Sequence, residues 1–284
     1  MTRTDIRDQP VAWPSCALGG WAAAWVAGTC APDDVITALG ESAEHHVIDD
    51  HCGTVDTGPG GVLDLLGVLR DADQLVVRLP AAGDAAGLPP GAATTAAFAA
   101  GEVLLVSDGQ AQAGSCGPLA LIPTIVGHSQ WSTHADLICR WAVHRYPDPV
   151  DLGTLASGGP TAADIEYQLR QAIRDAAALF SEHRNTAKSF SPGDLRGRLA
   201  ALTLRHEVTL PPSTTDTRTT RMIASAAQIE AIVELAVTER VELGAAAAHQ
   251  ATVDEEFRRL CVLARGARAA AVNATIAELL RPRR

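Results

Sequence analysis

The segment HHVIDDHC (45–52) gathers the side chains that most often ligate zinc and similar divalent ions: three histidines, two aspartates and a cysteine. In an extended strand His45, Asp49 and His51 project to one face, so these three are the candidate metal ligands. Their spacing matches no zinc motif, and a more distant histidine would have to complete the site: His128, His134 or His144. The alternative is a strand end whose histidines and aspartates face solvent.

The segment TIVGHSQWSTH (124–134) places a serine directly after an apolar stretch. Its sequence around Ser129 is one residue short of the G-x-S-x-G turn that holds the nucleophile of α/β-hydrolases. Trp131 stands where that turn requires a glycine, and no helix signal follows. The histidines later in the helical part of the chain are poorly placed to complete a triad. We therefore expect a polar loop here and assign no catalytic residue.

The loop AAGDAAGLPPG (81–91) follows the clearest predicted strand and lacks the glycine patterns that cradle phosphate. In a structural turn Gly83 and Gly87 would supply positive φ, and Asp84 would bond backbone amides. Loops at the carboxyl ends of strands are also where ligands bind in open α/β sheets. Gly83, Asp84 and Gly87 are therefore the candidate ligand or partner residues.

Arginines recur on the last predicted helix and in the C-terminal tail: Arg258, Arg259, Arg265, Arg268, Arg281, Arg283 and Arg284. The first four fit a solvated helix face opposite Phe257 and Leu260, and nearby acidic residues can pair with some of them. The basic tail could also contact an acidic surface of the same chain or of a second one.

Short apolar runs that end in turn residues predict the strands that must position these segments, at 44–52, 74–80, 102–108, 118–126 and 137–146. Helical patterns at 16–28 and 31–40 precede the first strand, and those at 62–73 and 94–102 separate the next ones, whereas the last strands follow one another without a helix between them. This order predicts a mixed sheet with helices on one or both faces. The glycines between Gly153 and Pro160 predict a linker.

Beyond the linker the pattern is helical, with helices expected to begin at Thr161, near Pro192 and near Thr217, and a last helix that ends near Leu279. Long helices with small alanine faces pack closely into bundles. The predicted fold class is thus α+β. A mixed α/β domain occupies residues 1–152, and a bundle of long antiparallel helices occupies residues 160–284.

Composition supports this division. Residues 1–150 hold all five tryptophans and 17 acidic against six basic residues, whereas the rest hold 16 acidic against 17 basic residues. Such a break favours two structural units. The formal net charge of −10 repels nucleic-acid backbones, so we expect no nucleic-acid partner.

The segment CALGGWAAAWVAG (16–28) is the only stretch similar to a signal peptide. Asp5 and Asp8 offset the upstream arginines, and the run is shorter than the roughly 20 residues that a membrane span needs. We therefore expect a buried helix in a cytoplasmic protein without a membrane partner. The six cysteines contain no C-x-x-C pair and are expected to be free thiols.

Several blocks together resemble an uncharacterised family of actinobacterial proteins: residues 19–39, 76–91, 96–106 and 267–276. The most specific block is the loop LPAAGDAAGLP (79–89), which follows the pattern LP-x-x-GD-x-x-GLP. The resemblance implies a cytoplasmic location and the overall organisation given above. It carries no catalytic residue over to this chain.

We therefore expect a non-catalytic cytoplasmic protein that acts through protein–protein contacts or through self-association of its long helices. The alternative is a small-molecule sensor or an enzyme with its site in the N-terminal domain. Such an enzyme would be metal-dependent at His45, Asp49 and His51, or hydrolytic at Ser129. A divalent metal ion is the one cofactor that the sequence leaves open.

Overall fold

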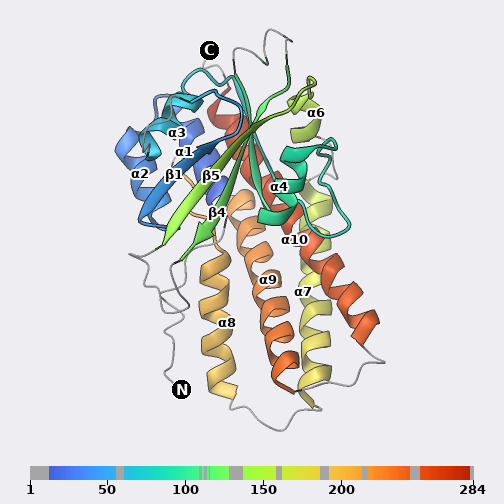
Figure 1. Ribbon diagram of the computed structural model, residues 1–284. Helices are drawn as coiled ribbons and strands as arrows, with labels where there is room; N and C mark the ends of the chain where they lie inside the picture. Colours follow the sequence, from blue (N-terminus) through green and yellow to red (C-terminus); the bar gives the residue numbers. More distant parts are fainter. Residues whose placement is uncertain are drawn as a thin grey trace.

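The computed structural model describes residues 13–55, 61–108, 111, 114, 116–127, 137–157, 162–185, 192–212, 217–243 and 250–281. Within these residues, five strands form one mixed sheet, and helices pack on both of its faces (Figure 1). Four long helices follow the sheet in the chain and extend away from it. The predicted fold class is confirmed.

The strands are β1 (His45–Asp50), β2 (Gln74–Arg78), β3 (Val103–Ser107), β4 (Leu119–Val126) and β5 (Ile138–Arg145). Each lies within the range that its apolar run predicted. Their order in the sheet is β1-β5-β4-β3-β2, with β1 parallel to β5 and every other pair antiparallel. The described sheet therefore has β1 at one edge and β2 at the other.

The helices of the sheet region are α1 (Pro14–Val26), α2 (Pro32–Gly40), α3 (Val62–Leu69), α4 (Ala92–Ala100) and α6 (Leu152–Ser157). The last of these corrects a prediction, because α6 occupies most of the stretch that we expected to be a linker. Asp151 accepts hydrogen bonds from the backbone N–H and the hydroxyl of Thr154 and so caps this short helix. Leu152 fixes α6 to the sheet, since its side chain is buried in the core.

The helical part comprises α7 (Ala162–Asn185), α8 (Pro192–His206), α9 (Thr217–Leu243) and α10 (Gln250–Leu279). Figure 1 shows α7, α8 and α9 extending below the sheet, while α10 starts in the bundle and continues upward beside α1. Residues 254–279 of α10 form a segment that is long and apolar enough, by composition, to cross a membrane. However, 56% of its most apolar stretch of 18 residues is buried inside the protein. The buried face of α10 packs against α9 and α7 in the bundle and against α1 and β2 in the sheet region.

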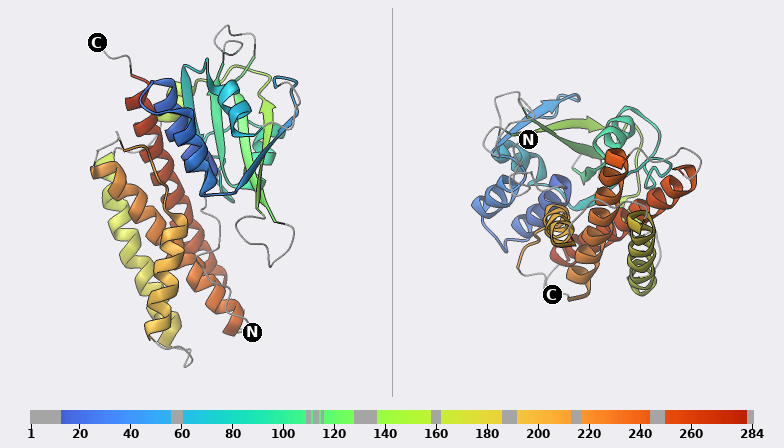
Figure 2. Two further views of the ribbon diagram at one scale, coloured as in Figure 1. Left: turned by 90° about the vertical axis from the view of Figure 1, so that its left-hand side faces the viewer. Right: turned by 90° about the horizontal axis from the view of Figure 1, so that it is seen from below.

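Strand β3 shows how the two faces of the sheet are used. Leu104 and Val106 point toward α1 and α10, whereas Val103 and Leu105 point toward α4 and α6. The core on the α1 side continues into the bundle and includes Ile229 of α9. Figure 2 shows α1 lying between the sheet and the bundle. The two parts of the chain therefore share one hydrophobic core.

Two contacts bring α10 close to β2. Gly19 of α1 leaves space there, because a Cβ at this position would lie 3.0 Å from side-chain atoms of both Ile276 and Val77. The side-chain amide of Asn273 accepts a hydrogen bond from Val77 N at 2.8 Å and donates one to Val77 O at 3.0 Å. The amide thus pairs with the outer edge of β2 as another strand would.

Candidate functional site

A cluster of charged side chains lies inside the protein where the sheet region meets the bundle. Arg268 of α10 is fully buried, and its Nη1 forms an ion pair with Glu230 of α9, which is 5% exposed. Arg268 Nη2 donates to the carbonyl oxygen of His206 at 3.0 Å, and its guanidinium lies 4.5 Å from the centre of the Trp13 ring. The ion pair and these contacts offset part of the cost of burying both charges, while the Nε of Arg268 is buried without a hydrogen-bond partner among the described residues.

Glu102 enters the same cluster from the sheet side. Its carboxylate accepts hydrogen bonds from the backbone N–H of Ser15, at 2.9 Å, and from the Ser15 hydroxyl. It therefore satisfies a free donor in the first turn of α1. Burial raises the pKa of Glu102 to about 7, although the hydrogen bonds from Ser15 and the charges of Arg265 and Arg268 act in the opposite direction.

His206 and Glu234 extend the cluster toward the surface of the bundle. The Nε2 of His206 lies 2.8 Å from Glu234 Oε2, and Arg205 Nη1 donates to Glu234 Oε1 at 2.7 Å. The hydrogen bond from His206 and the charge of Arg205 lower the pKa of the Glu234 carboxyl. These ion pairs connect α8 to α9.

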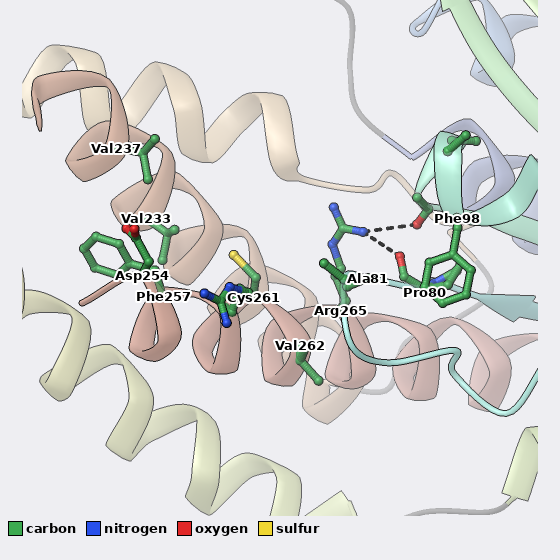
Figure 3. A pocket seen from close by; sticks show the side chains of 15 residues that line it. Pro80, Ala81, Phe98, Val233, Val237, Asp254, Phe257, Cys261, Val262 and Arg265 are labelled. Atoms are coloured by element: carbon green, nitrogen blue, oxygen red, sulfur yellow. Dashed lines mark hydrogen bonds between the residues drawn. The ribbon is translucent and has the colours of Figure 1, made fainter. Parts of the chain in front are cut away.

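Beside this cluster a cavity of about 510 Å³ opens between the two parts of the chain (Figure 3). The sheet region contributes Pro80 to Ala82 after β2 and Phe98 to Gly101 at the end of α4. The bundle contributes Val233 and Val237 from α9. Helix α10 contributes six residues: Asp254, Phe257, Arg258, Cys261, Val262 and Arg265. We refer to this cavity as the junction pocket. Its size and its position between two structural units are typical of ligand sites.

Arg265 connects the junction pocket to the buried charge cluster. Its Nη1 donates to Pro80 O at 2.8 Å and to Gly101 O at 3.4 Å, and its Nε lies 3.7 Å from Glu230 Oε1. Gly101 has a φ of 80°, and a Cβ there would lie 3.0 Å from Arg265 Nη1. Glycine at the end of α4 thus permits both the left-handed turn and the approach of the guanidinium.

Cys261, whose side chain can act as a nucleophile when ionised, lines the pocket. Burial raises the pKa of its thiol to about 11, and the charge of Glu230 acts in the same direction. The side chain therefore remains a neutral thiol at physiological pH and contributes a small apolar surface.

The structure brings two of the three candidate metal ligands together. His51 Nε2 lies 3.8 Å from Asp49 Oδ2, and the His51 ring stacks on His144 with ring centres 4.4 Å apart. His45 lies four residues before Asp49, which is roughly 13 Å along an extended strand. Arg140 Nη1 also lies 3.7 Å from Asp49. Among the residues that the structure describes, no group of three or more His, Cys, Asp or Glu side chains is arranged to hold a metal ion.

His46, the next residue of that segment, belongs to the core. Trp141 Nε1 donates to His46 Nδ1 at 3.0 Å, while His46 Nε2 lies 3.2 Å from Leu39 O and 3.1 Å from Ala43 O. The proton therefore resides on Nε2, where it faces both carbonyl oxygens. Burial lowers the pKa of His46, which keeps the ring neutral.

The candidate ligand loop lies beside the junction pocket. Its first residue, Ala81, lines the cavity, whereas Gly83, Asp84 and Gly87 do not. Gly83 and Gly87 have φ values of 88° and 77°, and Asp84 Oδ1 accepts a hydrogen bond from Ala86 N at 2.8 Å. This is the turn geometry that the glycines and the aspartate predicted. Ser129 and Trp131 lie outside the described residues.

The arginines of the last helix correct the expected solvated face. Arg258 and Arg259 are exposed and pair with Glu255 and Glu256 one turn earlier, as expected. Arg268, in contrast, is fully buried, and Arg265 is 26% exposed. The sequence contains a signal for this, because Arg268 lies four residues after Ala264 and three before Ala271, inside the apolar stripe of α10. Glu230 has the same relation to Ala226 and Val233.

Comparisons with known proteins assign the chain to a family. Residues 15–152 match the N-terminal domain and residues 163–272 match the C-terminal domain of the Rv1486c-like proteins, and the chain belongs to this family. It is 29% identical over 290 residues to the uncharacterized protein Rv1486c of Mycobacterium tuberculosis H37Rv, with 93% of this chain and 97% of that protein covered.

A second relative is the uncharacterized protein ML1804 of Mycobacterium leprae, which is 28% identical over 298 residues with the same coverage of both chains. The resemblance to an uncharacterised actinobacterial family is thereby confirmed. No solved structure matches the chain.

Proposed function

We propose that this chain is a non-catalytic cytoplasmic protein that works by binding, with the junction pocket as its binding site. The observation that carries the proposal is the construction of the pocket, whose walls come from the loop after β2 and α4 on one side and from α9 and α10 on the other. A ligand bound there contacts both parts of the chain and so stabilises one arrangement of them. The long helices would pass this response on to a protein partner or to a second copy of the chain.

The lining residues support binding better than reaction chemistry. Phe98 and Val237 are 38% and 45% exposed and add apolar area to the lining of the pocket. Cys261 remains a neutral thiol, and the Nη1 of Arg265 is engaged with two backbone carbonyls. The pocket thus offers apolar contact area with a fixed positive charge.

Native mass spectrometry of the protein purified from a mycobacterial host tests this proposal. We expect a bound small molecule, seen as a mass that dissociates on activation. The variant Ala99→Phe, which fills the pocket from an exposed position on α4, should lack that mass. Ala92→Phe, an equally exposed alanine of the same helix outside the pocket, should keep it. Identical bare masses for the parent protein and both variants would contradict the proposal.

Size exclusion with light scattering tests the self-association. A dimer or larger species at high micromolar concentration is the expected result. A clean monomer would exclude a second copy as the partner and leave a different protein in that role.

A metal-dependent role is the second candidate, since Asp49, His51 and His144 are neighbours, and it requires these side chains to leave the stacked and paired arrangement that the structure shows. Addition of zinc, manganese or nickel should then raise the melting temperature, and His144→Ala should abolish the increase. No bound metal and no thermal shift with any of the three ions would exclude this role.

A further inference from the structure

We infer that the ligand of the junction pocket is an organic acid with an apolar body, and that its anionic head binds Arg265. This inference rests on the proposed function, because it names the chemical class of molecule that the same pocket accepts. It is carried by three features of the pocket: its apolar walls, the fixed guanidinium between them, and the distribution of charge along α10.

The apolar walls of the pocket favour a ligand with a hydrocarbon portion. Val233 and Phe257 form a buried floor, while Phe98 and Val237 stand partly exposed at the rim. Figure 3 shows Val233, Val237 and Phe257 on one side and Phe98 with Pro80 on the other, with Arg265 between the two sides. A hydrocarbon chain laid along this surface would remove apolar area of the protein and of the ligand from water.

Arg265 is held in place before any ligand arrives. Two backbone carbonyls bind its Nη1, and its guanidinium lies 5.0 Å from the centre of the Trp13 ring. Its Nη2 has no hydrogen-bond partner among the described residues, and the side chain is 26% exposed. A fixed guanidinium with a free donor binds a carboxylate with little loss of side-chain entropy.

The charged residues along α10 determine which charge the head group of the ligand carries and where in the pocket it binds. Arg265 lies between the bundle wall and the sheet wall of the pocket, and Arg258 lies two turns before it on the same helix. Asp254 is eleven residues before Arg265, roughly 16 Å along the helix axis. Glu255 pairs with Arg258, and the buried Glu230 lies 3.7 Å from the Nε of Arg265. The attraction for an anionic head therefore comes from the Nη2 donor of Arg265, whereas a cationic head beside the same guanidinium is repelled.

Isothermal titration with three probes of equal chain length tests the inference on the unaltered protein. We expect decanoate to bind about tenfold or more tightly than decanol, because the carboxylate gains a charge-assisted hydrogen bond. Decylammonium should bind most weakly. Ala99→Phe should abolish decanoate binding, and Ala92→Phe should leave it unchanged.

Arg265→Gln provides the second arm. We expect it to weaken decanoate binding about tenfold and to leave decanol binding unchanged, with circular dichroism confirming that the variant is folded. The comparison of head groups on the unaltered protein decides the question if this variant fails to fold.

Three results would overturn the inference. In the first, all three probes bind with equal affinity and Ala99→Phe abolishes their binding. The pocket would then be a binding site without preference for an anionic head, and the proposed function would stand. Absence of decanoate binding, or decanoate binding that Ala99→Phe does not affect, would exclude this ligand class for the pocket. The mass measured on the protein expressed in a mycobacterial host decides the proposed function independently.

Discussion

Arg268 and Glu230 place opposite charges inside the core, and each depends on the other. Removal of Arg268 leaves the buried Glu230 with the more distant Arg265 and His206, at 3.7 Å and 3.8 Å. Loss of one partner of a buried ion pair costs about 3–5 kcal/mol. We therefore predict that Arg268→Met lowers the free energy of unfolding in urea by about that amount. Arg259→Met, on the exposed face of the same helix, should change it by less than about 0.5 kcal/mol.

The double variant Glu230→Leu with Arg268→Met distinguishes a lost charge from lost packing. It should cost clearly less than the two single changes added together, because neither charge then remains unpaired. Additive costs would show that the two side chains act independently.

Glu102 makes the stability of the protein depend on pH. Its pKa of about 7 in the folded protein lies above the ordinary value of 4.5, so the folded state binds the proton more tightly. The contribution of Glu102 is therefore fully present below pH 4.5 and is lost as pH rises toward 7. Glu102→Gln removes this loss.

We predict that the free energy of unfolding of Glu102→Gln, relative to the parent protein, increases by at least about 1 kcal/mol from pH 5 to pH 8. Urea titrations of both proteins at the two pH values measure this difference. A difference that does not change with pH would show that Glu102 is ionised in the folded protein throughout this range.

At the scale of the elements, Asn273 closes the outer edge of β2. Its amide satisfies both backbone groups of Val77, so Asn273→Leu leaves a buried N–H and a buried carbonyl without partners. We predict a loss of about 1–3 kcal/mol in the free energy of unfolding and faster hydrogen exchange at the Val77 amide. Glu278→Gln, an exposed change near the end of α10, is the control. Unchanged exchange at Val77 would contradict this role of the amide.

The strands could be predicted from sequence, because apolar β-branched runs that end in turn residues have one interpretation. The helices of the bundle could be predicted for the same reason, since their apolar positions recur with helical spacing. The stretch after Gly153 could not, because its glycines hide a helix that depends on the cap at Asp151 and the burial of Leu152.

The site was harder to predict than the elements. Arg265 and Arg268 share a helix with the exposed Arg258 and Arg259, and composition alone does not separate the two pairs. The position of Arg268 within the apolar stripe of α10 does distinguish it from the exposed arginines. The pocket itself depends on how α4 meets α9 and α10, and that contact joins residues more than 100 positions apart.

At the scale of the whole molecule, the two parts that match separate domains of the family are joined by one core and one buried charge cluster. A binding site between them requires that they hold together as a unit. The unfolding of each part has its own spectroscopic signal: tryptophan fluorescence for the first part and helical circular dichroism mainly for the second. All five tryptophans lie in the first 150 residues, and the longest helices lie after residue 160.

Equilibrium unfolding in urea, followed at once by tryptophan fluorescence and by far-ultraviolet circular dichroism, tests this unity most directly. If the binding site lies between two mutually dependent parts, both signals must change in one transition with the same midpoint, and Arg268→Met must lower both midpoints together. Two separate transitions, or a shift of only one of them in Arg268→Met, would contradict it.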